Sequence, residues 1–329
     1  MMKKIKILLL FILGLLIFSF INFRPARDPE WGVNFSIPHA RYLGFDPQQM
    51  YLDILYELQP KYVRTMAYWE IIEPKQGKFD FSEIDPLVHA ASKSNTKLIM
   101  VVGLKQPRWP ECHRPGWASR QELGIRNQAL LDYIKAVVER YKHSDAVYAW
   151  QVENEPFFSY GPECGRIERS LFKSEIELVR ALDDRPIVVT DSGEKGDWFL
   201  TAWAGGDIFG STMYREVYHH KKGKYIKYQI PAEFYRFKAG LVKTLSSLNE
   251  FVGVELQAEP WFTETDVHHT SWEQQSRHMN PEIFQEYVEY AEKAGFAQNY
   301  FWGVEWWYWA RQQGHPEMWE AGKSIINDN

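Results

Sequence analysis

The sequence has little cysteine, no excess of positive charge and no low-complexity tract. Its 329 residues include 38 Lys and Arg against 43 Asp and Glu, which gives a formal net charge of −5 at pH 7. This balance offers no basic face for a phosphate backbone, so nucleic acid is not an expected partner. No long linker or repeat of fixed period interrupts the chain after residue 25, which predicts a single domain over residues 26–329.

Cysteine is limited to Cys112 and Cys164. Two sulfurs at this spacing do not predict a metal site, and the two His-His pairs do not add one, because adjacent residues on an extended segment point to opposite sides. No metal or organic cofactor is therefore expected. The two cysteines form one disulfide bond in an oxidising compartment or stay separate thiols in a reducing one. They follow the third and fourth predicted strands, where a bridge would pin neighbouring loops together.

The first 25 residues have the pattern of a membrane-targeting helix. Lys3, Lys4 and Lys6 precede an uncharged, mostly apolar run of 17 residues from Ile7 to Phe23. The run is at the short limit of a membrane-spanning helix, and neither a small-residue cleavage motif nor a lipid-attachment cysteine follows it. An uncleaved signal-anchor is favoured over a cleaved signal peptide. Lysines before the run predict that the remaining chain lies outside the cytoplasm, anchored to the membrane or secreted.

After this segment, short apolar runs alternate with amphipathic stretches near the 3.6-residue period. Eight runs predict strands, at residues 31–35, 62–66, 97–102, 146–152, 186–190, 208–213, 252–257 and 298–302. The helical patterns between them include residues 47–58, 83–92, 120–141, 167–182, 232–248 and 281–294. Eight βα units predict an α/β fold, the (β/α)8 TIM barrel, whose functional residues lie in the loops after the strands.

Two of the predicted strands lead into a glutamate followed by proline. Residues 150–156 read Trp-Gln-Val-Glu-Asn-Glu-Pro, with Glu155 after the fourth strand. Residues 254–261 read Val-Glu-Leu-Gln-Ala-Glu-Pro-Trp, with Glu259 after the seventh. Cleaving a glycosidic bond needs one carboxyl group to protonate the leaving oxygen and a second, ionised one to attack or stabilise the anomeric centre. Two glutamates at one end of a barrel are suited to this chemistry.

These motifs resemble the clan A glycoside hydrolases, the retaining TIM-barrel clan, in which an Asn-Glu pair ends strand four and a second glutamate ends strand seven. The tryptophan-rich segment 300–309 and the stretch 64–81 add to the resemblance. The second stretch is similar to the equivalent part of several families, including the family 5 cellulase-like and family 42 β-galactosidase-like groups. The resemblance therefore implies a clan and not a single family.

The resemblance implies a role for each matched residue. Glu155 is expected as the general acid/base, Glu259 as the nucleophile, and Asn154 as the donor to the 2-hydroxyl of the sugar. Arg64 is expected to keep the nucleophile ionised, since a guanidinium within hydrogen-bond reach lowers the pKa of a carboxyl group. Tyr214 is expected to hydrogen-bond the nucleophile. An ion pair inside the barrel remains the alternative for Arg64, and a packing role the alternative for Tyr214.

Other carboxylates and aromatic residues compete for a place in the site. Glu153, Glu255 and Glu305 are spare carboxylates, and Glu255 lies inside its strand, where a buried salt bridge is the better expectation. The chain has 14 tryptophans, and aromatic faces stack on the C–H faces of sugar rings. Trp302 is the expected floor of the reacting subsite, and the further walls are expected from Trp306, Trp69 and Trp261.

The expected function is that of a retaining β-glycoside hydrolase acting on an oligo- or polysaccharide. A catalytically silent barrel that binds glycan at the cell surface is one alternative. A transglycosylase, in which a sugar hydroxyl intercepts the glycosyl intermediate, is another. No protein partner is predicted, and no motif fixes the sugar, its linkage, or endo against exo action.

Overall fold

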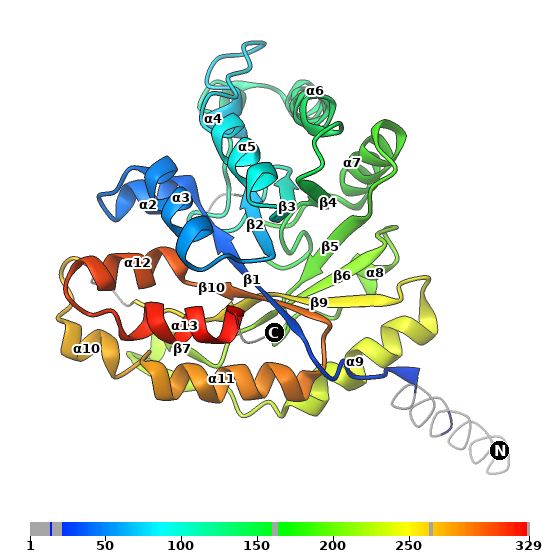
Figure 1. The fold of residues 1–329 in the computed structure, drawn as a ribbon. Coiled ribbons are helices and arrows are strands. Elements are labelled where there is room, and N and C mark those ends of the chain that lie inside the picture. The colour runs from blue at the N-terminus through cyan, green and yellow to red at the C-terminus, as the bar shows by residue number, and fades with distance from the viewer. Residues whose placement is uncertain (1–13, 15–21, 160–163, 263–265, 328–329) are drawn as a thin grey trace, which may run out of the picture.

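The structure, a computed structural model, is a closed barrel of eight parallel strands with helices around its outside (Figure 1). It describes residue 14 and residues 22–159, 164–262 and 266–327. Around the barrel the strands follow the order β1, β10, β9, β6, β5, β4, β3 and β2. The predicted TIM barrel is confirmed, with the chain's last strand closing against its first.

All eight predicted strands are present, and their ends differ from the predicted ends by no more than two residues. The barrel strands are β1 (Glu30–Phe35), β2 (Tyr62–Met66), β3 (Lys97–Val102), β4 (Val147–Val152), β5 (Ile187–Asp191), β6 (Ile208–Met213), β9 (Glu250–Gln257) and β10 (Gln298–Trp302). Strands of a parallel barrel are covered on both faces, so they read as apolar runs that a sequence pattern finds easily.

The helices fall into a predicted group and an unpredicted one. The predicted helices are α3 (Pro47–Glu57), α5 (Asp85–Lys93), α6 (Leu123–Tyr141), α7 (Arg169–Leu182), α9 (Ala232–Leu245) and α11 (Pro281–Ala294). The unpredicted elements are α2 (Ile37–Tyr42), α4 (Trp69–Ile72), α8 (Phe199–Ala202), α10 (Trp272–Ser276), α12 (Val304–Gln312), α13 (Glu317–Asn327), short 3-10 turns at Ala118–Arg120 and His220–Lys222, and the antiparallel hairpin of β7 (Glu216–His219) and β8 (Lys224–Lys227). Most of the unpredicted elements lie in the loops that follow strands, where a barrel carries its functional groups.

Two apolar layers hold the barrel together. Alternate strand residues, among them Ile99, Ala149, Val188 and Val252, fill the interior of the barrel. The intervening residues face outward and pack against the helices in one large cluster. Because the interior is filled by side chains, the strand ends present a site surface and not a pore.

The predicted membrane-targeting helix over residues 1–25 lies mostly outside the described residues. Within the part of the chain that the structure describes, no helix is both long enough and apolar enough to cross a membrane.

Candidate active site

Arg64 lies at the centre of the polar groups inside the barrel mouth. Its guanidinium, on β2, is fully buried and donates to four side chains. Nε donates to Gln151 at 2.7 Å, Nη2 to Asn154 Oδ1 at 2.9 Å, and Nη1 to Asn34 Oδ1 at 2.9 Å. Nη1 also donates to Glu255 Oε1 at 2.8 Å, which makes a buried ion pair. Separating the partners of such a pair would leave a buried charge without compensation, which is strongly unfavourable. The network therefore holds these side chains in one arrangement.

Glu255 receives a donor on each carboxylate oxygen. Arg64 donates to Oε1, and the hydroxyl group of Tyr214 donates to Oε2 at 3.0 Å. Both side chains were expected to contact Glu259, four residues later, and that expectation is wrong, because both contact Glu255. The expectation of a buried salt bridge at Glu255 is confirmed, and its partner is Arg64.

A bulge in β9 explains how a residue inside the strand reaches the mouth. Between Gly253 and Glu255, strand β9 advances two residues while β6 advances one, from Ser211 to Thr212. Its other neighbour, β10, also loses register at this point. An extra residue in one strand bends it and re-aims a side chain. Glu255 therefore points into the barrel mouth.

Glu155 lies opposite, directly after β4, with a positive φ of 45°. Its backbone N–H donates to Thr190 Oγ1 at 3.1 Å, and Thr212 Oγ1 donates to its Oε1 at 3.3 Å. Burial raises the pKa of the Glu155 carboxyl well above its usual range, and the negative charges of Glu111 and Glu255 add to this shift. A carboxyl group in this state keeps its proton near neutral pH and can act as a general acid.

One pocket contains both carboxyl groups. Glu155 and Glu255 line it together with Asn154, Tyr214 and Trp261. Four of the predicted site residues thus meet at one place: Glu155, Asn154, Tyr214 and Trp261. Arg64 lies beneath them and reaches the pocket through Asn154 and Glu255.

Two predicted aromatic walls, Trp69 and Trp306, and the predicted floor, Trp302, do not line this pocket. Trp69 is fully buried, stacks on Tyr133 and donates its indole N–H to Glu73. Trp306 is also buried and donates its indole N–H to Gln275. Neither lines the pocket, so their prediction as walls is corrected: both pack in the layer between strands and helices. Trp302 lies at the end of β10, but it too does not line the pocket.

Glu259, the predicted nucleophile, is held by Arg108 from the loop after β3. Arg108 donates to both oxygens of Glu259, and its Nη2 also donates to Glu305 Oε2 at 3.0 Å. The guanidinium carbon lies 4.1 Å from the ring centroid of Trp302. Glu259 is absent from the pocket lining.

The loop after β3 is anchored to the loop after β4. The predicted disulfide bond between Cys112 and Cys164 is present, with Cα atoms 5.3 Å apart. Lys105 adds two hydrogen bonds from its ammonium group, to the backbone oxygens of Glu155 at 2.9 Å and Phe158 at 2.7 Å. Glu111 lies on the same loop beside Asn154, and burial raises its pKa to about 8. The general acid candidate therefore lies on a stiffened support.

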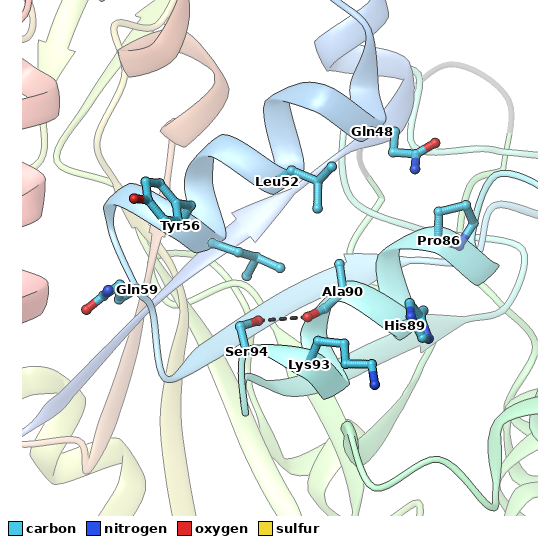
Figure 2. A pocket seen from close by; sticks show the side chains of 10 residues that line it. Gln48, Leu52, Tyr56, Gln59, Pro86, His89, Ala90, Lys93 and Ser94 are labelled. Carbon is cyan, nitrogen blue, oxygen red and sulfur yellow. Dashed lines mark hydrogen bonds between the residues drawn. The ribbon is translucent and has the colours of Figure 1, made fainter.

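A second hollow lies on the outer surface, between α3 and α5 (Figure 2). Leu52, Tyr56, His89 and Lys93 are among the residues that line it, and none of the lining residues is Asp or Glu. It lacks the paired carboxyl groups that glycosidic bond cleavage requires. The strand-end pocket is the better candidate for the active site.

Sequence reasoning missed the part played by Arg108, Glu111 and Lys105. All three lie on the loop after β3, which carries no repeat or periodic pattern. In that loop region, Gly103, Arg108 and Glu111 all have a positive φ. No sequence pattern reveals this backbone conformation. Its cysteine was the one available signal that this loop is joined to the site.

Comparison with known proteins supports the same clan. Residues 65–176 match the model of Glycosyl hydrolase family 10. Beta-galactosidase BgaA of Clostridium cellulovorans is 26% identical over 182 residues, covering 49% of this chain and 28% of that protein. Mannan endo-1,4-beta-mannosidase A of Emericella nidulans is 27% identical over 146 residues, covering 40% of this chain and 36% of that protein. These alignments span about a third of the length of the two relatives.

The barrel also superposes on a solved structure. Native xylanase 10B from Thermotoga maritima has a TM-score of 0.62 at 14% identity, with 92% of this chain and 95% of that chain covered. At this identity the likeness shows the fold. The family match and the strand-end Asn154-Glu155 pair support the resemblance to the clan A glycoside hydrolases.

Proposed function

We propose that the chain is a retaining β-glycoside hydrolase in which Glu155 is the acid/base and Glu255 is the nucleophile. The observation that carries this proposal is the pair of donors on Glu255. Arg64 and Tyr214 were predicted to flank the nucleophile, and both contact Glu255, in the pocket that also contains Glu155. Glu259 is engaged by Arg108 instead.

Each half of the reaction follows from the charges of these two groups. In the first half, the Glu255 carboxylate attacks the anomeric carbon while the Glu155 proton passes to the leaving oxygen, so the glycosidic bond breaks and a glycosyl ester forms. In the second half, Glu155 removes a proton from water, whose oxygen bonds to the anomeric carbon as the ester breaks. Glu155 ends protonated and Glu255 ends ionised. Arg64 and Tyr214 stabilise the ionised form of Glu255 because both donate hydrogen bonds to it.

Azide rescue tests the assignment. Glu255→Ala should lower kcat at least a thousandfold on dinitrophenyl β-glycosides, and azide should restore part of the rate and give an inverted glycosyl azide. Glu259→Ala is the matched comparison, and it should gain nothing from azide. Rescue of Glu259→Ala, with no rescue of Glu255→Ala, would return the nucleophile to Glu259.

The same substrates separate the alternatives. A silent glycan-binding barrel would bind oligosaccharides, seen by calorimetry, with no turnover by the unaltered protein. A transglycosylase would give larger products when an acceptor sugar is added. The pocket contains both an acid with a raised pKa and an ion-paired carboxylate, which favours catalysis over binding alone.

We also propose a position outside the cytoplasm, with the N-terminal segment as anchor or signal. Three lysines before the apolar run support this, and so does the disulfide bond between Cys112 and Cys164, since such bonds persist in oxidising compartments. Membrane fractionation and N-terminal sequencing of the protein from its native cells would test both points. A cytoplasmic fraction with two titratable thiols would contradict the proposal.

A further inference from the structure

Space in the candidate active site extends to one side only. Beyond the two glutamates, the pocket is lined from the loops after β5 and β6 and from the β7–β8 hairpin, by residues such as Ser192, Lys195 and Tyr228. Among the described residues, none on β1, β2 or β10, or on the loops that follow them, lines it. The pocket therefore extends beside Glu155, and the described residues on the side of β10 and β1 contribute nothing to its lining.

The side of β10 and β1 is occupied by a cluster that we call the arginine bar: Arg108, Glu259, Glu305 and Trp302. Arg108 reaches from the loop after β3 across the barrel mouth to residues that follow β9 and β10. Its guanidinium lies over the Trp302 ring while its nitrogens bind the two carboxylates. The side chains of Arg108, Glu259 and Glu305 are 10%, 12% and 0% exposed, so the bar is largely buried and occupies the mouth at its own position.

Backbone and buried contacts hold the bar in place. Arg108 has a φ of 80°, a conformation that a non-glycine residue keeps only when its surroundings fix it. The backbone oxygen of Arg108 accepts from Glu111 N at 2.7 Å and contacts His113 Nε2 at 3.0 Å. On the other side, Ser36 N donates to Glu305 Oε1 at 2.6 Å. Arg108 and Glu305 are thus held in fixed positions in the barrel mouth by the surrounding structure.

The bar adjoins the reacting centre. The Tyr214 hydroxyl group donates to Glu255 and also senses the charges of the bar. Burial raises the pKa of Tyr214 most, the charges of Glu255 and Glu259 raise it further, and the charge of Arg108 lowers it. Glu259 follows Glu255 on the segment that leaves β9, and Trp302 ends β10, which pairs with β9 on the side opposite to β6, so the bar lies beside the nucleophile on the side of β10.

The two sides of the site bind different parts of the substrate. A general acid must lie beside the oxygen that it protonates, so the leaving group lies on the side of Glu155, where the pocket extends. The sugar that becomes bonded to Glu255 extends to the other side, toward the bar. We infer that the arginine bar closes the glycone side after a single sugar, so that the enzyme removes one residue at a time from the non-reducing end.

The bar also has the chemistry to recognise a chain end. A terminal sugar presents hydroxyl groups where an internal sugar presents a glycosidic bond, and the paired donors and acceptors of Arg108 and Glu259 suit such groups. An internal sugar would place its next residue against the bar and clash.

This inference rests on the proposed function, and one substrate set tests the two separately. The set contains aryl β-monosaccharides and β-1,4-linked manno-, xylo-, gluco- and galacto-pentasaccharides labelled at the reducing end. Each pentasaccharide is also prepared with its non-reducing terminal hydroxyl groups blocked by an acetal. The unaltered protein should give a labelled tetrasaccharide and a free monosaccharide first, and should cut the blocked form at least a hundredfold more slowly.

Removing the bar should relax this selectivity. Arg108→Ala and Glu259→Gln should each raise the rate on the blocked pentasaccharide, relative to the open one, at least tenfold. Arg114→Ala is the matched control, because Arg114 lies on the same loop, bonds Ser119 and does not line the pocket, so this ratio should not change. Glu259→Gln nearly preserves shape, which keeps the test usable if Arg108→Ala fails to fold.

The outcomes are distinct. If the unaltered protein cuts blocked and open pentasaccharides equally, or releases internal fragments first, the bar does not close the glycone side and this inference is wrong while the hydrolase assignment stands. If both bar variants keep the full preference for open chains, another part of the mouth sets it and the role of the bar is refuted. Turnover of no substrate, aryl monosaccharides included, counts against the proposed function and against this inference with it.

Discussion

Glu175→Gln should remove a pH dependence of folding stability that arises directly beneath the candidate acid. Glu153, on the turn after β4, and Glu175, on α7, are both fully buried. Glu153 accepts from the backbone N–H groups of Leu104 at 2.7 Å and Lys105 at 2.6 Å. Neither oxygen of Glu175 has a donor among the described residues, and its one carboxyl neighbour is Glu153. Glu175 is therefore expected to be neutral and to donate its proton to Glu153, since a buried carboxylate without a donor is costly.

The loss of folding stability with rising pH follows from the proton that Glu175 retains in the folded protein. Burial raises the pKa of Glu175 well above its ordinary value of 4.5, and the neighbouring charge of Glu153 raises it further. A raised folded-state pKa means that the folded protein holds the proton more tightly than the unfolded chain. Stability is then full below about pH 4.5 and falls as the pH rises toward the raised pKa of Glu175. Each pKa unit of difference between the folded and unfolded states corresponds to about 1.4 kcal/mol of lost stability.

Urea unfolding at pH 5 and pH 8 measures this directly. The glutamine amide donates to Glu153 at every pH, so Glu175→Gln should be more stable than the unaltered protein at pH 8 and should vary less between the two conditions. Glu175→Ala is the control without a donor, and it should be less stable than Glu175→Gln at both values. The reasoning is refuted if Glu175→Gln retains the full loss of stability between pH 5 and pH 8.

Three further predictions concern the support and the site. Replacing both Cys112 and Cys164 by serine removes a crosslink between residues 52 positions apart in the sequence. The free energy of unfolding should fall by up to about 4 kcal/mol in the chain-entropy model. An unchanged urea midpoint would contradict this. Burial and then neighbouring negative charges raise the pKa of Glu155, so kcat/KM on poor leaving groups should fall only above neutral pH. Glu155→Gln should lose about 100- to 10,000-fold on those substrates and far less on dinitrophenyl glycosides, and equal losses would refute its acid role. Trp261→Ala should raise KM up to about tenfold, with Trp261→Phe between the two, and an unchanged KM would show that its ring does not stack on the sugar.

The barrel could be predicted because its signal is local. Strands buried on both faces read as short apolar runs, and the helices α3, α6 and α11 carry an apolar stripe. Helix α12 has no such stripe, because Val304 to Ala310 are all buried, and no helix was predicted for this segment. The strand-end position of Glu155 followed from the same local signal, and the disulfide bond followed from the predicted order of the loops.

The proposed nucleophile, Glu255, could not be predicted in that way, because its position depends on a departure from strand geometry. Val252 and Val254 face the barrel interior, so a regular two-residue alternation would turn Glu255 outward, toward the helices. The bulge at this point changes that alternation, and Glu255 meets Arg64 inside the mouth. Glu259 looked better placed because it follows the strand, as Glu155 does. Arg64 distinguishes the two glutamates: a buried guanidinium on β2 requires a carboxylate within reach, and among the described residues Glu255 supplies it, while Glu259 is matched by Arg108. In this barrel, the buried cation inside the mouth is therefore the basis for proposing Glu255 as the second catalytic carboxylate.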